Sequence, residues 1–182
     1  MTHPLERIKP ERQKYYFYAL LALTLLLLLS MNFIGMPLNT AAAPQGIISF
    51  EFAATPERAQ QMLDSWTPEG RVRAGFIQGL DFLFPLAYST TVGLGCVMAA
   101  GVIARRGQAA SRLGGWLAWG LWAAAALDYV ENIGLVVLIF GTVTSPWPQL
   151  AAVCAAIKFA LLAAGLVYAF YGLARKAVPV AK

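Results

Sequence analysis

Reactive side chains are scarce in this sequence. The chain has one histidine, His3 in the N-terminal tail, which excludes a metal site built from histidines. Its two cysteines, Cys96 and Cys154, fall in predicted helices at depths that differ by about 23 Å, at a rise of 1.5 Å per residue. A disulfide needs Cα atoms within roughly 7 Å. We therefore expect no disulfide-linked redox chemistry, no metal and no cofactor.

Charged residues are also few, and apolar residues are gathered in long blocks. Of the 182 residues, 13% are charged and 59% are hydrophobic. Crossing a hydrocarbon layer about 30 Å thick takes roughly 20 helical residues, and four blocks are long enough: about 15–36, 74–104, 113–140 and 147–174. The sequence predicts an all-α, polytopic membrane protein, with residues 1–182 forming one domain, an antiparallel bundle of four transmembrane helices.

The basic residues sort by side of the predicted membrane. The net charge is +5, and ten of the 14 Lys and Arg residues lie before the first helix, in the second connection or after the fourth helix. Only Arg58, Arg71 and Arg73 lie on the other side, so the positive-inside rule places both termini in the cytoplasm. The basic excess follows from topology, and nucleic acid is not an expected partner.

The first helix has one competing interpretation. A basic start, an apolar run and three alanines at 41–43 imitate a secretory signal with its cleavage site. The run of about 22 residues exceeds the 7 to 15 of a usual signal core. An uncleaved first helix is therefore expected.

The loop over residues 37–73 is predicted to hold one short amphipathic helix on the extracytoplasmic side. Thr55, Pro56 and Glu57 have the pattern of an N-cap, a proline at the first helical position and an early acid. One face of this helix is apolar: Ala59, Met62, Leu63 and Trp66. We expect a cover over the outer helix ends, with a movable lid as the alternative.

Ionisable side chains within the predicted helices give the main functional signal, since inserting each one costs about 2.5 to 3.5 kcal/mol. Asp128, Glu131 and Asn132 share one face of the third helix, in the stretch LDYVENIGL. Counting to the outer helix ends gives depths of about 10 to 18 Å for all four ionisable groups: Asp81, Asp128, Glu131 and Lys158. This predicts one shared polar site in the outer half of the bilayer.

The second predicted helix adds polar residues to this site. Gln78, Asp81 and Tyr88 share a face, and Pro85 stands four residues after Asp81. Proline there leaves the Asp81 carbonyl without its helical donor and kinks the helix. We expect an acceptor-rich polar cavity at the kink, with a kink that only shapes the bundle as the alternative.

Charge balance predicts what the site holds. Three carboxylates against the one ammonium of Lys158 leave two negative charges, so protons or a cationic group must neutralise them. The competing interpretation is purely structural: Lys158 pairs with one carboxylate, and Asn132 and Gln78 bridge helices to fix their packing. The predicted ligand-binding residues are Asp81, Asp128, Glu131, Asn132, Lys158, Gln78 and Tyr88.

The fourth helix has a stripe of small residues at every fourth position: Ala152, Ala156, Ala160 and Ala164. Such a stripe permits close helix contact, and it lies roughly opposite Lys158. If Lys158 faces inward, the alanines face outward, which predicts a homo-oligomer or a partner helix.

The segments LDFLFPLAY, LDYVENIGL and PWPQLAAVCAAIKFALL resemble a group of small, uncharacterised bacterial membrane proteins with four helices. That resemblance implies the bacterial inner membrane and brings no activity. The architecture is also similar to the emopamil-binding and sigma-2 receptor group, whose bundles hold sterol-like or cationic amphiphiles against buried carboxylates. The absence of a histidine within the predicted spans differs from its isomerase members.

The first functional hypothesis is therefore a binding protein or carrier for a lipid-like or cationic amphiphilic molecule, with membrane lipid as a further partner. The second is an intramembrane isomerase or cyclase with Glu131 or Asp128 as general acid or base. A proton-coupled exporter and a structural subunit of a membrane complex are the remaining alternatives.

Overall fold

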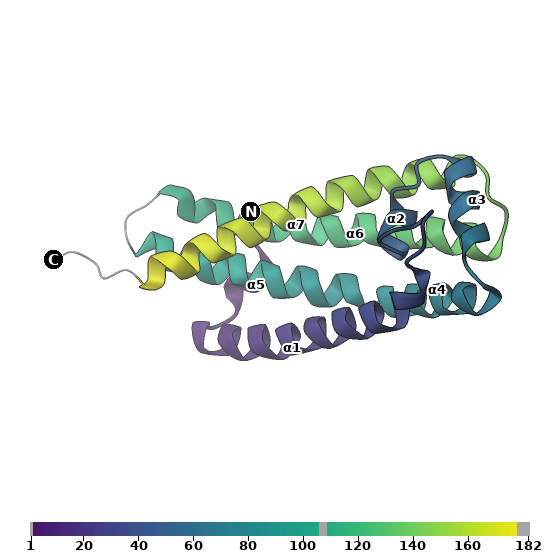
Figure 1. The fold of residues 1–182 in the computed structure, drawn as a ribbon. Helices are drawn as coiled ribbons and strands as arrows, with labels where there is room; N and C mark the ends of the chain where they lie inside the picture. The colour runs from purple at the N-terminus through teal and green to yellow at the C-terminus, as the bar shows by residue number, and fades with distance from the viewer. Residues whose placement is uncertain (1, 106–108, 178–182) are drawn as a thin grey trace. The chain divides into compact units, whose positions relative to one another are not determined.

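The computed structural model describes residues 2–105 and 109–177, and over these residues it is helical with no strand (Figure 1). The long helices are α1 (Pro10–Gly35), α5 (Phe84–Ala104), α6 (Leu113–Phe140) and α7 (Trp147–Ala177). The short elements are η1 (Pro4–Arg7), η2 (Met36–Leu38), α2 (Ile47–Glu51), α3 (Pro56–Ser65), α4 (Pro68–Asp81) and η3 (Ala109–Arg112).

Four helices are long and apolar enough to cross a membrane. They cover Pro10–Leu38, Phe84–Ala104, Ala110–Phe140 and Trp147–Lys176, with mean hydropathies from 1.7 to 2.3. This confirms four apolar helices of sufficient length. The bounds of the second one were wrong: the expected helix over 74–104 is two helices, because α4 ends at Asp81 and α5 begins at Phe84.

The chain forms two compact units, which we describe separately. Unit 1 comprises Met1–Thr24, Leu86–Ala125 and Lys158–Lys182, and unit 2 comprises Leu25–Pro85 and Ala126–Ile157. The unit boundaries fall within the long helices, so α1, α5, α6 and α7 each have residues in both units. That residues 1–182 form one domain stays a prediction.

The predicted amphipathic helix is α3, which belongs to the core of unit 2. The Thr55 side chain accepts a hydrogen bond from the Arg58 N–H at 3.2 Å, as an N-cap does. The predicted apolar face is buried: Ala59, Met62, Leu63 and Trp66. The same core holds residues of α2, α4, α6 and α7: Phe50, Ala74, Ile77, Leu135, Leu138 and Ala151. Because a continuous core holds α3, a fixed cover is favoured over a movable lid.

Unit 1 is packed through small residues. A Cβ added at Gly172 of α7 would overlap Ala99 of α5, and the Cys96 thiol donates to the Gly165 carbonyl at 3.3 Å. Leu5 of η1 is buried with Leu94, Val97 and Ala118. The N-terminal segment is therefore folded onto α5 and α6.

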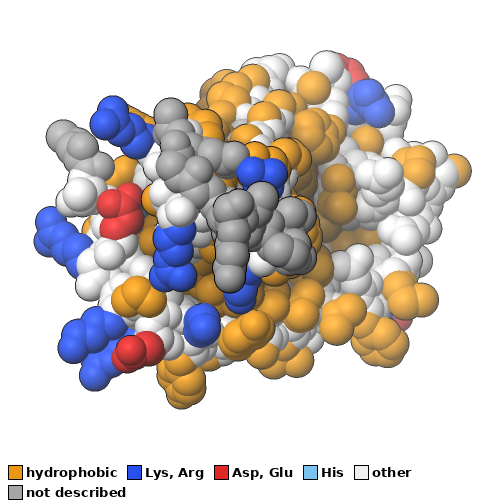
Figure 2. Space-filling view, turned by 90° about the vertical axis from the view of Figure 1, so that its left-hand side faces the viewer, with side chains coloured by type: hydrophobic (Ala, Val, Ile, Leu, Met, Phe, Trp, Pro, Cys, Tyr) orange, Lys and Arg blue, Asp and Glu red, His pale blue; other side chains and the backbone are white. Residues whose placement is uncertain are grey.

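Basic side chains are divided unequally between the units. Unit 2 has Arg58, Arg71 and Arg73, whereas unit 1 has every other described Lys and Arg: Arg7, Lys9, Arg12, Lys14, Arg105, Arg112, Lys158, Arg175 and Lys176. Figure 2 shows most of the Lys and Arg side chains in view gathered on one part of the face, with hydrophobic side chains beside them. Arg106 and Lys182, also expected on the cytoplasmic side, lie outside the described residues.

The alanine stripe of α7 faces outward, as helical periodicity predicts. Lys158 is buried, whereas Ala156, Ala160 and Ala164 are exposed and Ala152 is half-buried. A second copy or a partner helix on this stripe stays a prediction.

Candidate functional site

The break between α4 and α5 organises the polar residues of unit 2. Pro85 stands in the first turn of α5 and has no N–H. The Asp81 carbonyl therefore lacks the donor that a continuous helix would supply four residues later. The expected loss of the helical donor is thus seen, but in place of the expected kink α4 ends at Asp81.

Side chains of α6 bind both carbonyls at the break. The Asn132 amide donates to the Asp81 carbonyl at 3.0 Å, and the Tyr129 hydroxyl donates to the Phe82 carbonyl at 3.1 Å. The rings of Phe82 and Tyr129 also stack, with centroids 6.1 Å apart. A backbone carbonyl without a donor is costly in an apolar medium. The break thus depends on the polar residues of α6. The sequence did not indicate the role of Tyr129 as a donor to the Phe82 carbonyl.

A pair of buried amides joins α4 to α6. Gln78 Nε2 donates to Asn132 Oδ1 at 2.5 Å, so Asn132 uses both ends of its amide. Both side chains are completely buried. Within the residues that the structure describes, the buried Oε1 of Gln78 has no hydrogen-bond partner. This oxygen is an acceptor that a ligand could use.

Three carboxyl groups flank this amide pair on the same two helices. Asp81 follows Gln78 by three residues on α4, and Asp128 and Glu131 lie within about one turn of Asn132 on α6. All three are buried, with Glu131 at 0% exposure, and all three take part in interactions inside the protein. We name these five residues, all in unit 2, the acid–amide cluster.

The remaining two predicted site residues belong to unit 1. Lys158 of α7 is buried, with Nζ 5.2 Å from the centroid of the Phe159 ring, and Tyr88 of α5 is buried as well. The structure therefore brings five of the seven predicted residues into one unit. A role for Lys158 and Tyr88 in the same site stays a prediction.

Glu51 is a buried acid that sequence reasoning missed. It ends α2 in unit 2, is 5% exposed and lies next to the buried Phe50. The available signal was its place in the apolar stretch ISFEF, where an acid between two phenylalanines is unusual for a solvated loop.

Buried carboxyl groups outnumber buried ammonium groups more strongly than the sequence indicated. In the described part of the chain the buried acidic and basic residues are Glu51, Asp81, Asp128, Glu131, Lys158 and His3. These residues comprise four carboxyl groups but only one ammonium group and one imidazole. Protons, or a cation brought by a ligand, would restore the balance.

His3 corrects a further expectation, because it is not in a free tail. Its ring is completely buried in unit 1, with centroids 4.6 Å from Trp119 and 4.4 Å from Trp122, both in edge-on contact. Its Nδ1 accepts a hydrogen bond from the Leu5 N–H at 3.1 Å and caps η1. Trp119 and Trp122 of α6 thus enclose this ring on two sides.

Burial determines the charge of His3. Loss of solvent lowers the pKa of the imidazole below its usual 6.5, and the Glu6 carboxylate opposes that shift only in part. Since Nδ1 is an acceptor, the neutral ring carries its proton on Nε2, which is buried with no hydrogen-bond partner among the described residues. His3 is thus a neutral cap, and protonation would place a charge among aromatic rings.

Comparisons of this chain with models of protein families, with curated proteins and with solved structures give no match.

Proposed function

We propose that this protein is a multi-pass protein of the bacterial inner membrane, an antiparallel bundle of four spanning helices with both termini in the cytoplasm. The four apolar helices support insertion. The concentration of basic residues in the segments before α1, between α5 and α6 and at the end of α7 supports the orientation.

The acid–amide cluster binds a lipid-like or cationic amphiphilic molecule in this proposal. The observation that carries it is a group of buried acceptors on α4 and α6 of unit 2: the carboxyl groups of Asp81, Asp128 and Glu131, and the Gln78 Oε1 atom, which has no hydrogen-bond partner among the described residues. An ammonium headgroup can donate to the Gln78 Oε1 atom, and its positive charge suits a site rich in carboxyl groups. The apolar chain of the same molecule remains in the hydrocarbon of the bilayer, so that binding does not require its transfer into water.

The test uses a matched pair of amphiphiles in phosphatidylcholine nanodiscs. Dodecylamine carries a cationic headgroup, and N-dodecylacetamide has a similar chain without the charge. We expect dodecylamine to raise the melting temperature of the wild-type protein more than the acetamide does, because a ligand bound only by the folded state stabilises it. In Glu131→Gln or Asp128→Asn, dodecylamine affinity falls by about tenfold, the equivalent of about 1.4 kcal/mol.

Glu57→Gln is the matched control, since Glu57 is an exposed acid of α3 in the same unit. It keeps the wild-type response to dodecylamine. Equal responses to the two amphiphiles, or a wild-type response in both cluster variants, would contradict the proposed ligand class.

A packing role is the second candidate, and the hydrogen bonds at the α4–α5 break support it. Gln78 donates to Asn132, Asn132 donates to the Asp81 carbonyl, and Tyr129 donates to the Phe82 carbonyl. Under this role Glu131→Gln and Asp128→Asn change the melting temperature of the protein without ligand but leave both amphiphile responses alike. The same melting curves thus separate the two candidates.

A further inference from the structure

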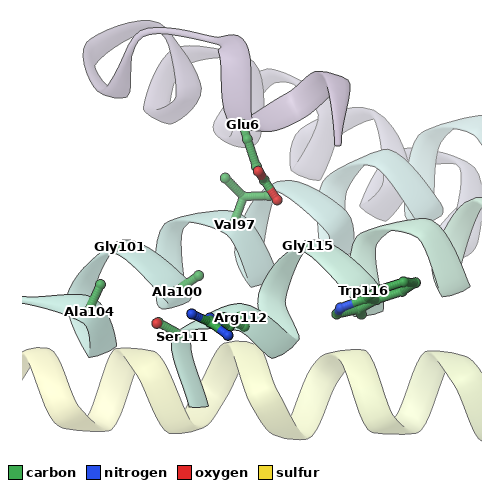
Figure 3. A pocket seen from close by; sticks show the side chains of 9 residues that line it. All are labelled: Glu6, Val97, Ala100, Gly101, Ala104, Ser111, Arg112, Gly115 and Trp116. Carbon is green, nitrogen blue, oxygen red and sulfur yellow. The ribbon is translucent and has the colours of Figure 1, made fainter. Parts of the chain in front are cut away.

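Unit 1 contains a pocket of about 440 Å³ that is separate from the acid–amide cluster. Its walls come from η1, the C-terminal half of α5, η3 and the first turn of α6 (Figure 3). The α5 wall is made mostly of small residues, and the polar or aromatic lining residues are Glu6, Ser111, Arg112 and Trp116. This volume lies within the range of small-molecule sites.

Two opposite charges line this pocket from different elements. Glu6 extends from η1 toward Val97 and Gly115, whereas Arg112 lies with Ser111 on η3, at another side of the space (Figure 3). In the described part of the chain no ion pair joins Glu6 to Arg112. A carboxylate and a guanidinium that share a pocket without pairing suit a molecule that carries both an ammonium and an anionic group.

The elements that carry these charges are fixed. The His3 side chain caps η1, and the Gln13 amide donates to the carbonyls of Leu5 and Ile8 at 3.3 and 3.0 Å. The Tyr168 hydroxyl of α7 donates to the Ala110 carbonyl of η3 at 2.9 Å. Both charged groups therefore start from a preformed backbone, which lowers the entropic cost of binding.

Gly115 makes room for the Glu6 carboxylate. A Cβ added at Gly115 would overlap the Oε1 atom of Glu6, so that any larger residue displaces the carboxylate. Gly115 is in the first turn of α6, where the helix dipole favours a negative charge. The carboxylate thus has a defined place in the wall of the pocket.

The surroundings resemble those of a lipid headgroup. Trp116 is 67% exposed at the rim, and Arg112 and Glu6 are exposed too. Exposed tryptophan and basic residues at the ends of apolar helices are typical of the level where membrane headgroups lie. Ser111 and Arg112 of the pocket lie on η3, directly before α6.

We propose that this pocket binds the headgroup of a zwitterionic phospholipid with a primary ammonium, of the phosphatidylethanolamine class. Arg112 binds the phosphate, the Ser111 hydroxyl donates to it, and the Glu6 carboxylate accepts from the ammonium. A primary ammonium donates hydrogen bonds, which a quaternary choline group cannot do. The proposal requires membrane insertion but not ligand binding at the acid–amide cluster.

Native mass spectrometry of the full-length protein in detergent tests this, with phosphatidylethanolamine, phosphatidylcholine and phosphatidylglycerol added at equal concentration. We expect phosphatidylethanolamine to be retained about five- to tenfold better than phosphatidylcholine. Arg112→Gln lowers retention of phosphatidylethanolamine and of phosphatidylglycerol. Glu6→Gln and Gly115→Ala lower that of phosphatidylethanolamine alone, because only this lipid uses the carboxylate.

Arg105→Gln and Glu11→Gln are the matched controls, exposed charges of unit 1 outside the pocket lining that should retain lipid as the wild type does. Glu57→Gln, an exposed acid of unit 2 outside both sites, should do so as well. Equal retention of the ethanolamine and choline lipids, or unchanged retention in Arg112→Gln and Glu6→Gln, would overturn the proposal. Saturable binding of soluble O-phosphoethanolamine without lipid retention would overturn the assignment to a lipid.

Discussion

Units 1 and 2 are both built from segments of the same long helices, but different interactions hold those helices together. In unit 2 a buried network of side chains joins α4 to α6, with Asn132 bonded to both Gln78 and the Asp81 carbonyl. In unit 1 close contacts of small residues join α5 to α7, as at Gly172 and Ala99. The comparison separates two ways in which helices associate in an apolar medium: polar side chains that bond across helices, and small residues that let backbones approach.

The difference has a functional consequence. A polar network offers hydrogen-bonding groups to protons, water or a cationic group. Close contacts between small apolar residues offer no such groups. Buried acid accordingly gathers in unit 2, at Glu51, Asp81, Asp128 and Glu131. The charged pocket of unit 1 is instead formed where helices end, between η1, η3 and the first turn of α6.

The largest expected effect comes from removing the centre of the unit 2 network. Asn132→Ala leaves the Asp81 carbonyl and the Gln78 amide without their partner, so we expect a loss of roughly 2 to 4 kcal/mol in the free energy of unfolding. Denaturant titration in detergent measures it. Asn32→Ala is the control, since the exposed Asn32 bonds only within its own helix. Equal losses in the two variants would show that the network does not hold unit 2 together.

A smaller effect is expected from enlarging the close contact between α5 and α7 in unit 1. In Gly172→Ala the new Cβ overlaps Ala99 and would lie 2.6 Å from its Cα, so α5 and α7 must move apart. We expect a loss of about 2 kcal/mol, in the range of overpacking mutations, measured by the same titration.

Gly79→Ala is the matched control for that contact, because a Cβ at Gly79 of α4 meets nothing within 4 Å. It should stabilise by about 0.5 to 1 kcal/mol, since alanine favours helix over glycine. A Gly172→Ala protein as stable as the wild type would contradict the close packing of unit 1.

The smallest expected effect is the pH dependence that His3 contributes in unit 1. Burial lowers the pKa of His3, so the unfolded chain binds the proton more tightly than the folded one. Stability is complete above the unfolded pKa of about 6.5 and falls as the pH drops below it, by at most about 1.4 kcal/mol per pH unit. Melting temperatures between pH 5 and 8 measure the slope.

His3→Asn keeps a capping side chain for η1 but removes the titrating ring, so the slope contributed by His3 disappears. Glu6→Gln removes the carboxylate that partly raises the His3 pKa, and the loss of stability should then continue to lower pH. An unchanged pH profile in His3→Asn would mean that the imidazole is as accessible to protons in the folded protein as in the unfolded chain.

Features set by local pattern were predictable. Long apolar runs identify four helices of sufficient length, and the pattern Thr55-Pro56-Glu57 identifies the start of α3 and its buried face. The spacing of Asp128, Glu131 and Asn132 also predicted a shared buried face, because helical periodicity alone decides which side chains point the same way. The end of α4 at Asp81 was within reach of the same reasoning, since Pro85 removes the necessary donor.

Features that depend on distant segments were not predictable. Nothing near His3 indicates that Trp119 and Trp122 enclose it, and nothing near Glu6 indicates a pocket shared with Arg112. The break between α4 and α5 is similarly stabilised by side chains from a distant segment, because Asn132 and Tyr129 of α6 donate to its carbonyls.

The sequence by itself determined the class of protein: a chain of long apolar helices with few ionisable residues inside them and most of its basic residues in the segments between and beyond them. Those properties depend on solvation and on the repeat of the helix, which act on each segment separately. The tertiary structure decided which polar groups meet, since a hydrogen bond or a pocket wall requires two elements at a defined distance. For this reason Asn132 was predictable as a buried polar residue, whereas its place at the broken end of α4 came only from the fold.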